Sequence, residues 1–218
     1  MEKEKLYMNQ LTRQKLYKLF GIKRVQTLAS LDNWLERGKA TSLNEKELLI
    51  AKTFQEILIK NIEDWTENEL SLGFIGPILN MIDFKIPYQL NFFTQRPLAA
   101  TVGDYEIIGK PDGLVAGGSA EPEAPYFNFH EYKRDVDSSG DPAGQNLAAM
   151  LVGQALNEKE DLIYGCYVVG RNWYFMVLQG KEFTISKDYS AVHDDDLQVI
   201  VQTLKALRQI LVDKLAVI

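Results

Sequence analysis

Residues 126–134 place a glutamate and a lysine inside an apolar, aromatic run, Tyr-Phe-Asn-Phe-His-Glu-Tyr-Lys-Arg. A run of this length and composition predicts a β-strand. Because successive side chains of a strand point to opposite faces, Glu131 and Lys133 share one face, and His130 and Tyr132 share the other. Any fold that contains this strand therefore puts a carboxylate and an amine side by side.

A second acid precedes this strand in the chain. Residues 105–109 predict the start of another strand, and the Lys-Pro-Asp-Gly stretch that follows delivers Asp112. If the two strands are neighbours, the carboxylates of Asp112 and Glu131 lie about 5 Å apart in the pairing direction. With Lys133 they would form a cluster of two acids and a lysine, which can hold Mg²⁺ and activate water. The alternative is that Glu131 and Lys133 form an ordinary exposed ion pair.

Pro111-Asp112 followed by Glu131-Tyr132-Lys133 resembles the signature of the PD-(D/E)XK nuclease superfamily, over about residues 69–170. The resemblance implies a restriction-endonuclease-like core and hydrolysis of phosphodiester bonds with Mg²⁺, for which Mn²⁺ substitutes. It also implies that Asp112, Glu131 and the backbone carbonyl of Tyr132 bind the metal. Lys133 would orient or deprotonate the attacking water, and only deprotonation requires its pKa to fall from about 10.4.

The chain contains a second acid-x-lysine stretch, Asp83-Phe84-Lys85, that serves as an internal comparison. No Pro-Asp strand precedes it, and no strand-then-helix pattern follows it. It therefore lacks the structural context that the motif needs for confirmation, whereas the Glu131 stretch has that context.

Two more side chains belong to the site that the resemblance implies. In the superfamily a helix before the first strand often brings a glutamate to the metal, and Glu69 is the best-placed candidate. Thr66 and Glu69 also have the spacing of a capping box, in which case Glu69 only closes the start of its helix. In the RecB-like branch the helix after the Glu-x-Lys strand presents a glutamine to the site. Gln145 matches it, but Ala149 stands where that branch has a tyrosine.

Other residues of metal-binding type have structural explanations. His130 faces away from Glu131 and is expected to pack or hydrogen-bond, with metal ligation as the alternative. Cys166 is the single cysteine and lies in an apolar strand, so we interpret it as structural. The three aspartates at 194–196 open the last helix, where the macrodipole favours negative charge.

The order of elements predicts a mixed α/β (α+β) protein in which a mixed sheet is flanked by helices. We expect a helical extension at residues 1–60 and a nuclease-like domain at residues 61–218. The expected elements are helices at 11–20, 25–35, 44–65 and 66–79, strands at 88–98, 105–109 and 126–134, a helix from 141, strands at 162–170, 173–178 and 183–185, and a helix from 194.

Composition limits the possible functions. The net charge of −6 disfavours nucleic-acid binding through bulk electrostatics, but residues 1–60 hold 12 Lys and Arg against 7 Asp and Glu. The basic side chains of this part could face phosphates, or could simply line solvated helix faces: Lys15, Lys18, Lys23 and Arg24. No run approaches the about 20 apolar residues of a membrane span, and no signal peptide opens the chain. A cytoplasmic location without membrane contact is expected.

The sequence therefore predicts a Mg²⁺-dependent or Mn²⁺-dependent nuclease whose partner is nucleic acid, with DNA expected. One alternative is the same fold as an inactive module that binds nucleic acid or protein. Another is a metal-independent structural protein that forms a homo-oligomer through exposed aromatic side chains such as Tyr88, Phe92 and Trp173.

Overall fold

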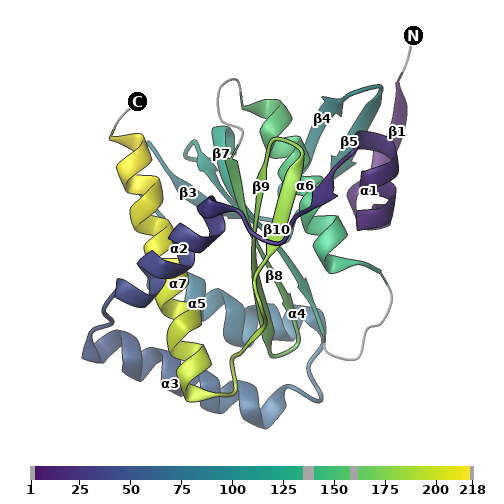
Figure 1. The fold of residues 1–218 in the computed structure, drawn as a ribbon. Coiled ribbons are helices and arrows are strands. Elements are labelled where there is room, and N and C mark those ends of the chain that lie inside the picture. The colour runs from purple at the N-terminus through teal and green to yellow at the C-terminus, as the bar shows by residue number, and fades with distance from the viewer. Residues whose placement is uncertain (1–2, 135–139, 158–161, 217–218) are drawn as a thin grey trace.

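A computed structural model describes residues 3–134, 140–157 and 162–216 (Figure 1). The elements are β1 (Glu4–Tyr7), η1 (Met8–Gln10), α1 (Arg13–Phe20), β2 (Lys23–Arg24), α2 (Ala29–Ala40), α3 (Glu45–Asn61), α4 (Glu67–Leu70), η2 (Ser71–Ile75), α5 (Gly76–Ile82), β3 (Asn91–Thr94), β4 (Leu98–Val102), β5 (Tyr105–Gly109), β6 (Gly113–Gly117), β7 (Glu123–Lys133), α6 (Pro142–Leu156), β8 (Leu162–Val169), β9 (Asn172–Gln179), β10 (Glu182–Ile185), β11 (Tyr189–Ser190) and α7 (Asp194–Leu215).

The described strands form two sheets. The larger sheet is mixed and has the order β2-β10-β9-β8-β7-β6-β3, with β11 paired to β9, and the smaller has the order β1-β5-β4. Strands β7 and β8 are parallel, and α6 makes the crossover between them, as a parallel pair requires. The predicted mixed α/β class is confirmed.

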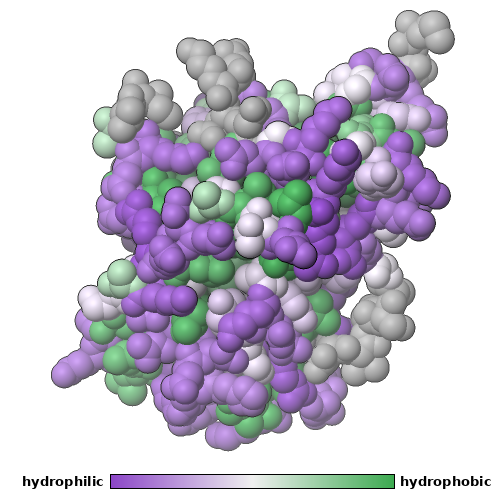
Figure 2. All heavy atoms as spheres, viewed as in Figure 1, coloured by the Kyte–Doolittle hydropathy of each residue, from purple (hydrophilic) through white to green (hydrophobic). Residues whose placement is uncertain are grey.

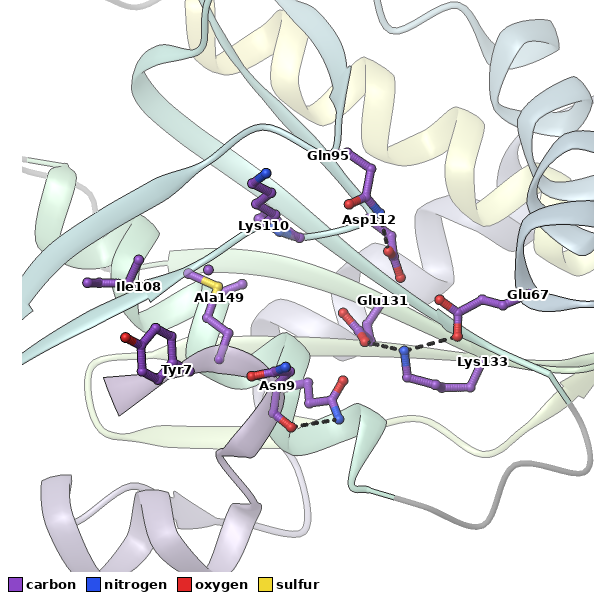
Figure 3. A pocket seen from close by; sticks show the side chains of 14 residues that line it. Tyr7, Asn9, Glu67, Gln95, Ile108, Lys110, Asp112, Glu131, Lys133 and Ala149 are labelled. Carbon is purple, nitrogen blue, oxygen red and sulfur yellow. Dashed lines mark hydrogen bonds and ion pairs between the residues drawn. The ribbon is translucent and has the colours of Figure 1, made fainter. Parts of the chain in front are cut away.

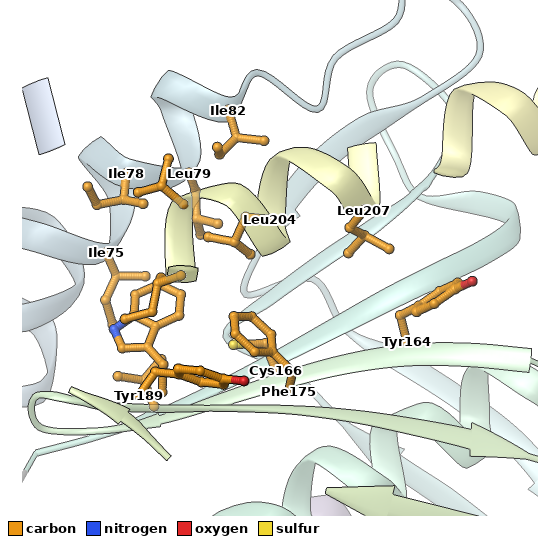
Figure 4. Close-up of a cluster of buried hydrophobic side chains, with 14 of the residues drawn as sticks. Ile75, Ile78, Leu79, Ile82, Tyr164, Cys166, Phe175, Tyr189, Leu204 and Leu207 are labelled. Atoms are coloured by element: carbon orange, nitrogen blue, oxygen red, sulfur yellow. The ribbon is translucent and has the colours of Figure 1, made fainter. Parts of the chain in front are cut away.

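The larger sheet is buried on both faces. Helices α2, α3, α5 and α7 cover one face, and α6 covers the other (Figure 1). On the first face, apolar side chains of α5 and α7 pack over sheet residues that include Tyr164, Cys166 and Phe175 (Figure 4). On the second face, a Cβ at Gly153 of α6 would lie 2.4 Å from the Phe129 ring, so only glycine lets this helix approach the sheet so closely. Cys166 is fully buried, as expected.

Residues 1–60 are built into both sheets and into the core. Strand β1 pairs in parallel with β5, and β2 pairs in parallel with β10. Trp34 of α2 is fully buried, stacks edge-on against Tyr164 and Phe175, and donates a hydrogen bond from Nε1 to the Thr203 carbonyl at 2.8 Å. The expected helical extension therefore omitted two strands, which are short and form only by pairing with distant parts of the chain.

The strands that lead to Asp112 differ from those expected. The predicted strand at 88–98 is interrupted by a bend, so that β3 joins the larger sheet and β4 the smaller. Strand β5 ends at Gly109 in the smaller sheet, and Asp112 instead precedes β6, a strand that the sequence analysis missed. Every residue of β6 is buried, so no polar alternation marked it as a strand.

A bulge in β7 puts its two phenylalanines, Phe127 and Phe129, on opposite faces of the sheet. The register with β6 shifts between Val115 and Ala116, because Phe127 is an extra residue of β7 at that point. Phe127 packs in the core under α7, whereas Phe129 packs on the α6 face. The strand is regular from there to its end, which leaves Glu131 and Lys133 on the α6 face.

The segment 67–82 is helical but irregular. Thr66 caps it in a capping box with Glu69, as predicted, and residues 71–75 form a π-helical turn closed by the Gly76 N–H and the Ser71 carbonyl. This wider turn comes just before Pro77, which cannot donate the regular helical hydrogen bond.

No described helix is long and apolar enough to cross a bilayer. The face shown in Figure 2 is covered mainly by hydrophilic side chains, with apolar ones in small separate areas.

The packing of Trp34 yields a stability prediction. Trp34→Ala should lower the free energy of unfolding by about 3–5 kcal/mol, because it empties a fully buried site and removes the hydrogen bond to the Thr203 carbonyl. Urea denaturation followed by circular dichroism measures this loss. The control is Leu49→Ala on α3, where the side chain is 68% exposed and about 0.5 kcal/mol or less is expected. Equal losses for the two variants would show that α2 is not part of the central core.

Candidate active site

Asp112 lies where the chain passes from the smaller sheet to the larger. Gly113, the first residue of β6, pairs with His130 of β7, so Asp112 reaches the level of Glu131. Its carboxylate is held there by the backbone, because the Tyr132 N–H donates to Asp112 Oδ2 at 2.7 Å. The two acids therefore meet through the pairing of β6 with β7, and not through the expected strand at 105–109.

Lys133 joins the acids in the same place (Figure 3). Its Nζ lies 2.8 Å from Glu131 Oε1, and it donates to the Tyr132 carbonyl at 3.0 Å. The side chains of Glu131 and Lys133 are only 12% and 16% exposed, so this is not the ordinary surface ion pair that the sequence also allowed. We refer to Asp112, Glu131 and Lys133 as the cluster.

The glutamate that the preceding helix brings to the cluster is Glu67 and not Glu69. Lys133 Nζ lies 3.2 Å from Glu67 Oε2, at the first residue of α4. Glu69 instead accepts hydrogen bonds from the Thr66 N–H and hydroxyl, which lower the pKa of Glu69. A carboxylate that closes a capping box is turned back toward its N-cap residue, so the spacing of Thr66 and Glu69 already counted against Glu69 as a ligand.

Two buried carboxylates in one place disfavour each other's charge. Burial raises the pKa of Glu131 to about 7, and the neighbouring charge of Asp112 adds to the rise while Lys133 opposes it. Burial also raises the pKa of Asp112, against the lowering effect of the Tyr132 N–H and of Lys133. The site therefore carries an excess of negative charge that a cation would relieve.

Lys133 is held in its charged form. Burial by itself would lower the pKa of the ammonium group, but the charges of Glu131, Glu67 and Asp112 outweigh burial and raise it. A lysine with a raised pKa is a poor base. Without a bound cation its charge suits Lys133 to orient water, and its role in the reaction stays a prediction.

The cluster faces a cavity of about 390 Å³, the cluster cavity (Figure 3). Its other walls come from the N-terminal segment, the end of β5 and helix α6: Tyr7, Asn9, Ile108, Lys110, Gln145 and Ala149. A second cavity of about 470 Å³, the apolar cavity, is lined partly by Leu72, Leu79 and Phe92. Glu67, Gln95 and Asp112 line both cavities and form the wall between them.

The remaining residues singled out by sequence have the following places. Gln145 lines the cluster cavity, where its Nε2 donates to the Asn9 carbonyl at 3.4 Å, and its catalytic role stays a prediction. His130 is fully buried on the other face beside Asn128, and burial lowers its pKa to about 3, so it packs as a neutral ring. In the comparison stretch, Asp83 and Lys85 are both exposed.

The sequence analysis missed Glu67, Gln95, Tyr7 and Asn9 as residues around the cluster. Tyr7 and Asn9 reach it because β1 pairs with β5 and η1 follows directly. Gln95 follows β3, whose pairing with β6 puts Gln95 opposite Asp112. Tyr7, Asn9 and Gln95 each depend on pairing between distant segments, which leaves no local pattern.

The oxygen donors of the cluster suit Mg²⁺, which keeps water ligands, better than a metal ion that takes all of its ligands from the protein. In the described part of the chain, no group of three or more His, Cys, Asp and Glu side chains is arranged to hold a metal ion. Mg²⁺ does not need such a cage, because it keeps several waters and is usually held by one or two carboxylates together with substrate phosphates. Asp112, Glu131 and the Tyr132 carbonyl supply hard oxygen donors of this kind.

No family model matches the chain, and a search of curated proteins finds no similar sequence. The interpretation of the cluster therefore depends on its geometry and on the motif resemblance.

The electrostatics of Glu131 predict that the cluster destabilises the metal-free fold. The folded protein binds a proton at Glu131 more tightly than the unfolded chain does, since its pKa rises from 4.5 to about 7. The ionised group therefore costs stability, fully above about pH 7 and progressively less as the pH falls toward 4.5. Glu131→Gln should raise the free energy of unfolding at pH 8 in EDTA by about 1–3 kcal/mol, and the gain should shrink at pH 5.

Urea denaturation at both pH values measures this effect. Glu56→Gln on α3 is the control, because Glu56 is exposed and does not line the cluster cavity. An equal gain in both variants, or no gain for Glu131→Gln at pH 8, would contradict the prediction.

Proposed function

We propose that this protein is a nuclease that hydrolyses phosphodiester bonds with Mg²⁺ or Mn²⁺ and has the restriction-endonuclease-like core that its motif implies. The observation that carries the proposal is the meeting of Asp112, Glu131 and Lys133 from two paired strands in one half-enclosed cavity. When bound, the metal would lower the pKa of a water ligand and offset charge on the phosphate.

The residues of the cluster divide the work of this reaction. Asp112, Glu131 and the Tyr132 carbonyl would hold the cation. Lys133, charged and anchored to Glu131 at 2.8 Å, would orient the attacking water and attract the phosphate through its charge. Glu67 forms a second ion pair with the Lys133 ammonium group and holds that group at the cavity wall.

The positions of the two cavities suggest how a nucleic-acid strand would lie on the protein surface. Asp112 lines both cavities, so a chain that occupied both of them would lie beside the cluster. Lys110 lines the cluster cavity and adds a basic side chain beside the acids. Together these features support a polymeric phosphodiester substrate, and the proposal takes DNA as the first substrate to test.

The proposal predicts metal-dependent cleavage that needs the cluster. With Mg²⁺ or Mn²⁺ the wild-type chain should cut plasmid or single-stranded DNA, and Asp112→Asn and Lys133→Ala should each lower the rate by at least about 100-fold. Gel assays against DNA and RNA measure the rates.

Lys85→Ala is the matched control, because it alters the exposed lysine of the Asp83-Phe84-Lys85 stretch and should leave the rate unchanged. Equal cleavage by all three variants would point to a contaminating nuclease. Absence of cleavage by the folded wild type on every substrate would contradict the proposal and favour an inactive module that binds nucleic acid or protein.

A further inference from the structure

We propose that Gln95 is a positioning residue that holds the Asp112 carboxylate ready for the cation, at the cost of a strained backbone. The inference rests on the proposed function, because it takes Asp112 to be a metal ligand. Three observations carry it: the hydrogen bonds of Asp112, the backbone conformation of Gln95, and the place of Gln95 in the wall between the two cavities.

The two oxygens of Asp112 are held by different donors. Gln95 Nε2 donates to Oδ1 at 2.5 Å, and the Tyr132 N–H donates to Oδ2 at 2.7 Å. The Gln95 N–H also donates to the Asp112 carbonyl at 3.3 Å, one residue beyond the Thr94–Gly113 pair of β3 and β6. With a donor on each oxygen, the carboxylate has no freedom to turn about its bond, and each oxygen retains a lone pair for a ligand.

The donor is chemically suited to a metal ligand. An amide is neutral, so it orients Asp112 without placing a second positive charge beside the cation, as an arginine or lysine would. Lys133 and Gln95 therefore have separate tasks, since Lys133 lies against Glu131 and Glu67 while Gln95 lies against Asp112 (Figure 3). Partners that orient a ligand in this way typically change metal affinity or activity by about 10–100-fold when removed.

Gln95 reaches Asp112 from a backbone conformation that glutamine rarely adopts. Its φ is 53°, in the left-handed region where a Cβ is unfavourable and glycine is at ease. Among the described non-glycine residues, Asp83 and Tyr88 share this feature, but neither lines the cluster cavity. Asp83 ends α5, and the side chain of Tyr88 is 92% exposed. A glycine would fit the backbone at 95 better but would lack the amide, so the strain accompanies a chemical need.

Two substitutions at 95 separate strain from positioning. Gln95→Ala removes the amide and keeps the strained Cβ, whereas Gln95→Gly removes both. Tyr88→Ala and Tyr88→Gly form the matched pair at an exposed position with φ of 64°. We would measure urea midpoints, Mn²⁺ affinity by calorimetry without substrate, and hydrogen exchange of the Tyr132 amide by NMR without metal.

Both Gln95 variants are expected to bind Mn²⁺ about tenfold or more weakly than wild type, and to exchange the Tyr132 amide proton faster because Asp112 is no longer held. Gln95→Gly should unfold at a higher urea concentration than Gln95→Ala. The Tyr88 pair should show the same order of midpoints with Mn²⁺ affinity and Tyr132 exchange unchanged.

Mn²⁺ affinity at the wild-type level together with unchanged Tyr132 exchange in both Gln95 variants would overturn the inference. If the wild type binds no Mn²⁺, the proposed function fails, and Tyr132 exchange then decides the inference by itself. Faster exchange in the Gln95 variants would support the positioning of Asp112, and unchanged exchange would refute it.

Discussion

The antiparallel pairing of β6 with β7 is the constraint on which the site depends. It brings Asp112 to the level of Glu131, and the bond from the Tyr132 N–H to Asp112 Oδ2 closes the pair. Side chains alternate along a strand, so a slip of one residue would reverse the two faces. His130 would then face the cavity, and Lys133 would enter the apolar core under α7. The bulge at Phe127 comes earlier in β7 than Glu131, so the last residues of the strand keep a regular alternation.

The buried charges of the cluster are expected to lower the free energy of unfolding of the metal-free protein. Asp112 and Glu131 both have raised pKa values in a setting that removes them from water, and Lys133 compensates only part of their charge. Perturbed ionisable groups gathered in a cavity are typical of functional sites. The same is true of backbone strain, which Gln95 shows in direct contact with Asp112. The features that we expect to destabilise the fold, two buried carboxylates and a strained backbone, therefore lie together at the motif.

Sequence reasoning succeeded where a pattern is local. The alternation around Glu131, the cap before α6 and the apolar stripe of α7 each follow from neighbouring residues, and each element formed as expected. It failed where position depends on distant pairing. Strand β6 is buried throughout and shows no alternation, and β1 and β2 are short strands that form against distant partners. Glu69 closes the capping box with Thr66, whereas Glu67 is left to pair with Lys133. The spacing of Thr66 and Glu69 in the sequence already indicated that Glu69 has this capping role.

We propose that the carboxylates of Asp112 and Glu131 bind a common cation. A crystal of the protein soaked in Mn²⁺, with anomalous scattering recorded near the manganese edge, tests this claim most directly. We expect a strong peak about 2 Å from an oxygen of each carboxylate, with the Tyr132 carbonyl as a further ligand. An intact Lys133–Glu131 pair with no peak between the acids, at saturating Mn²⁺, would contradict it.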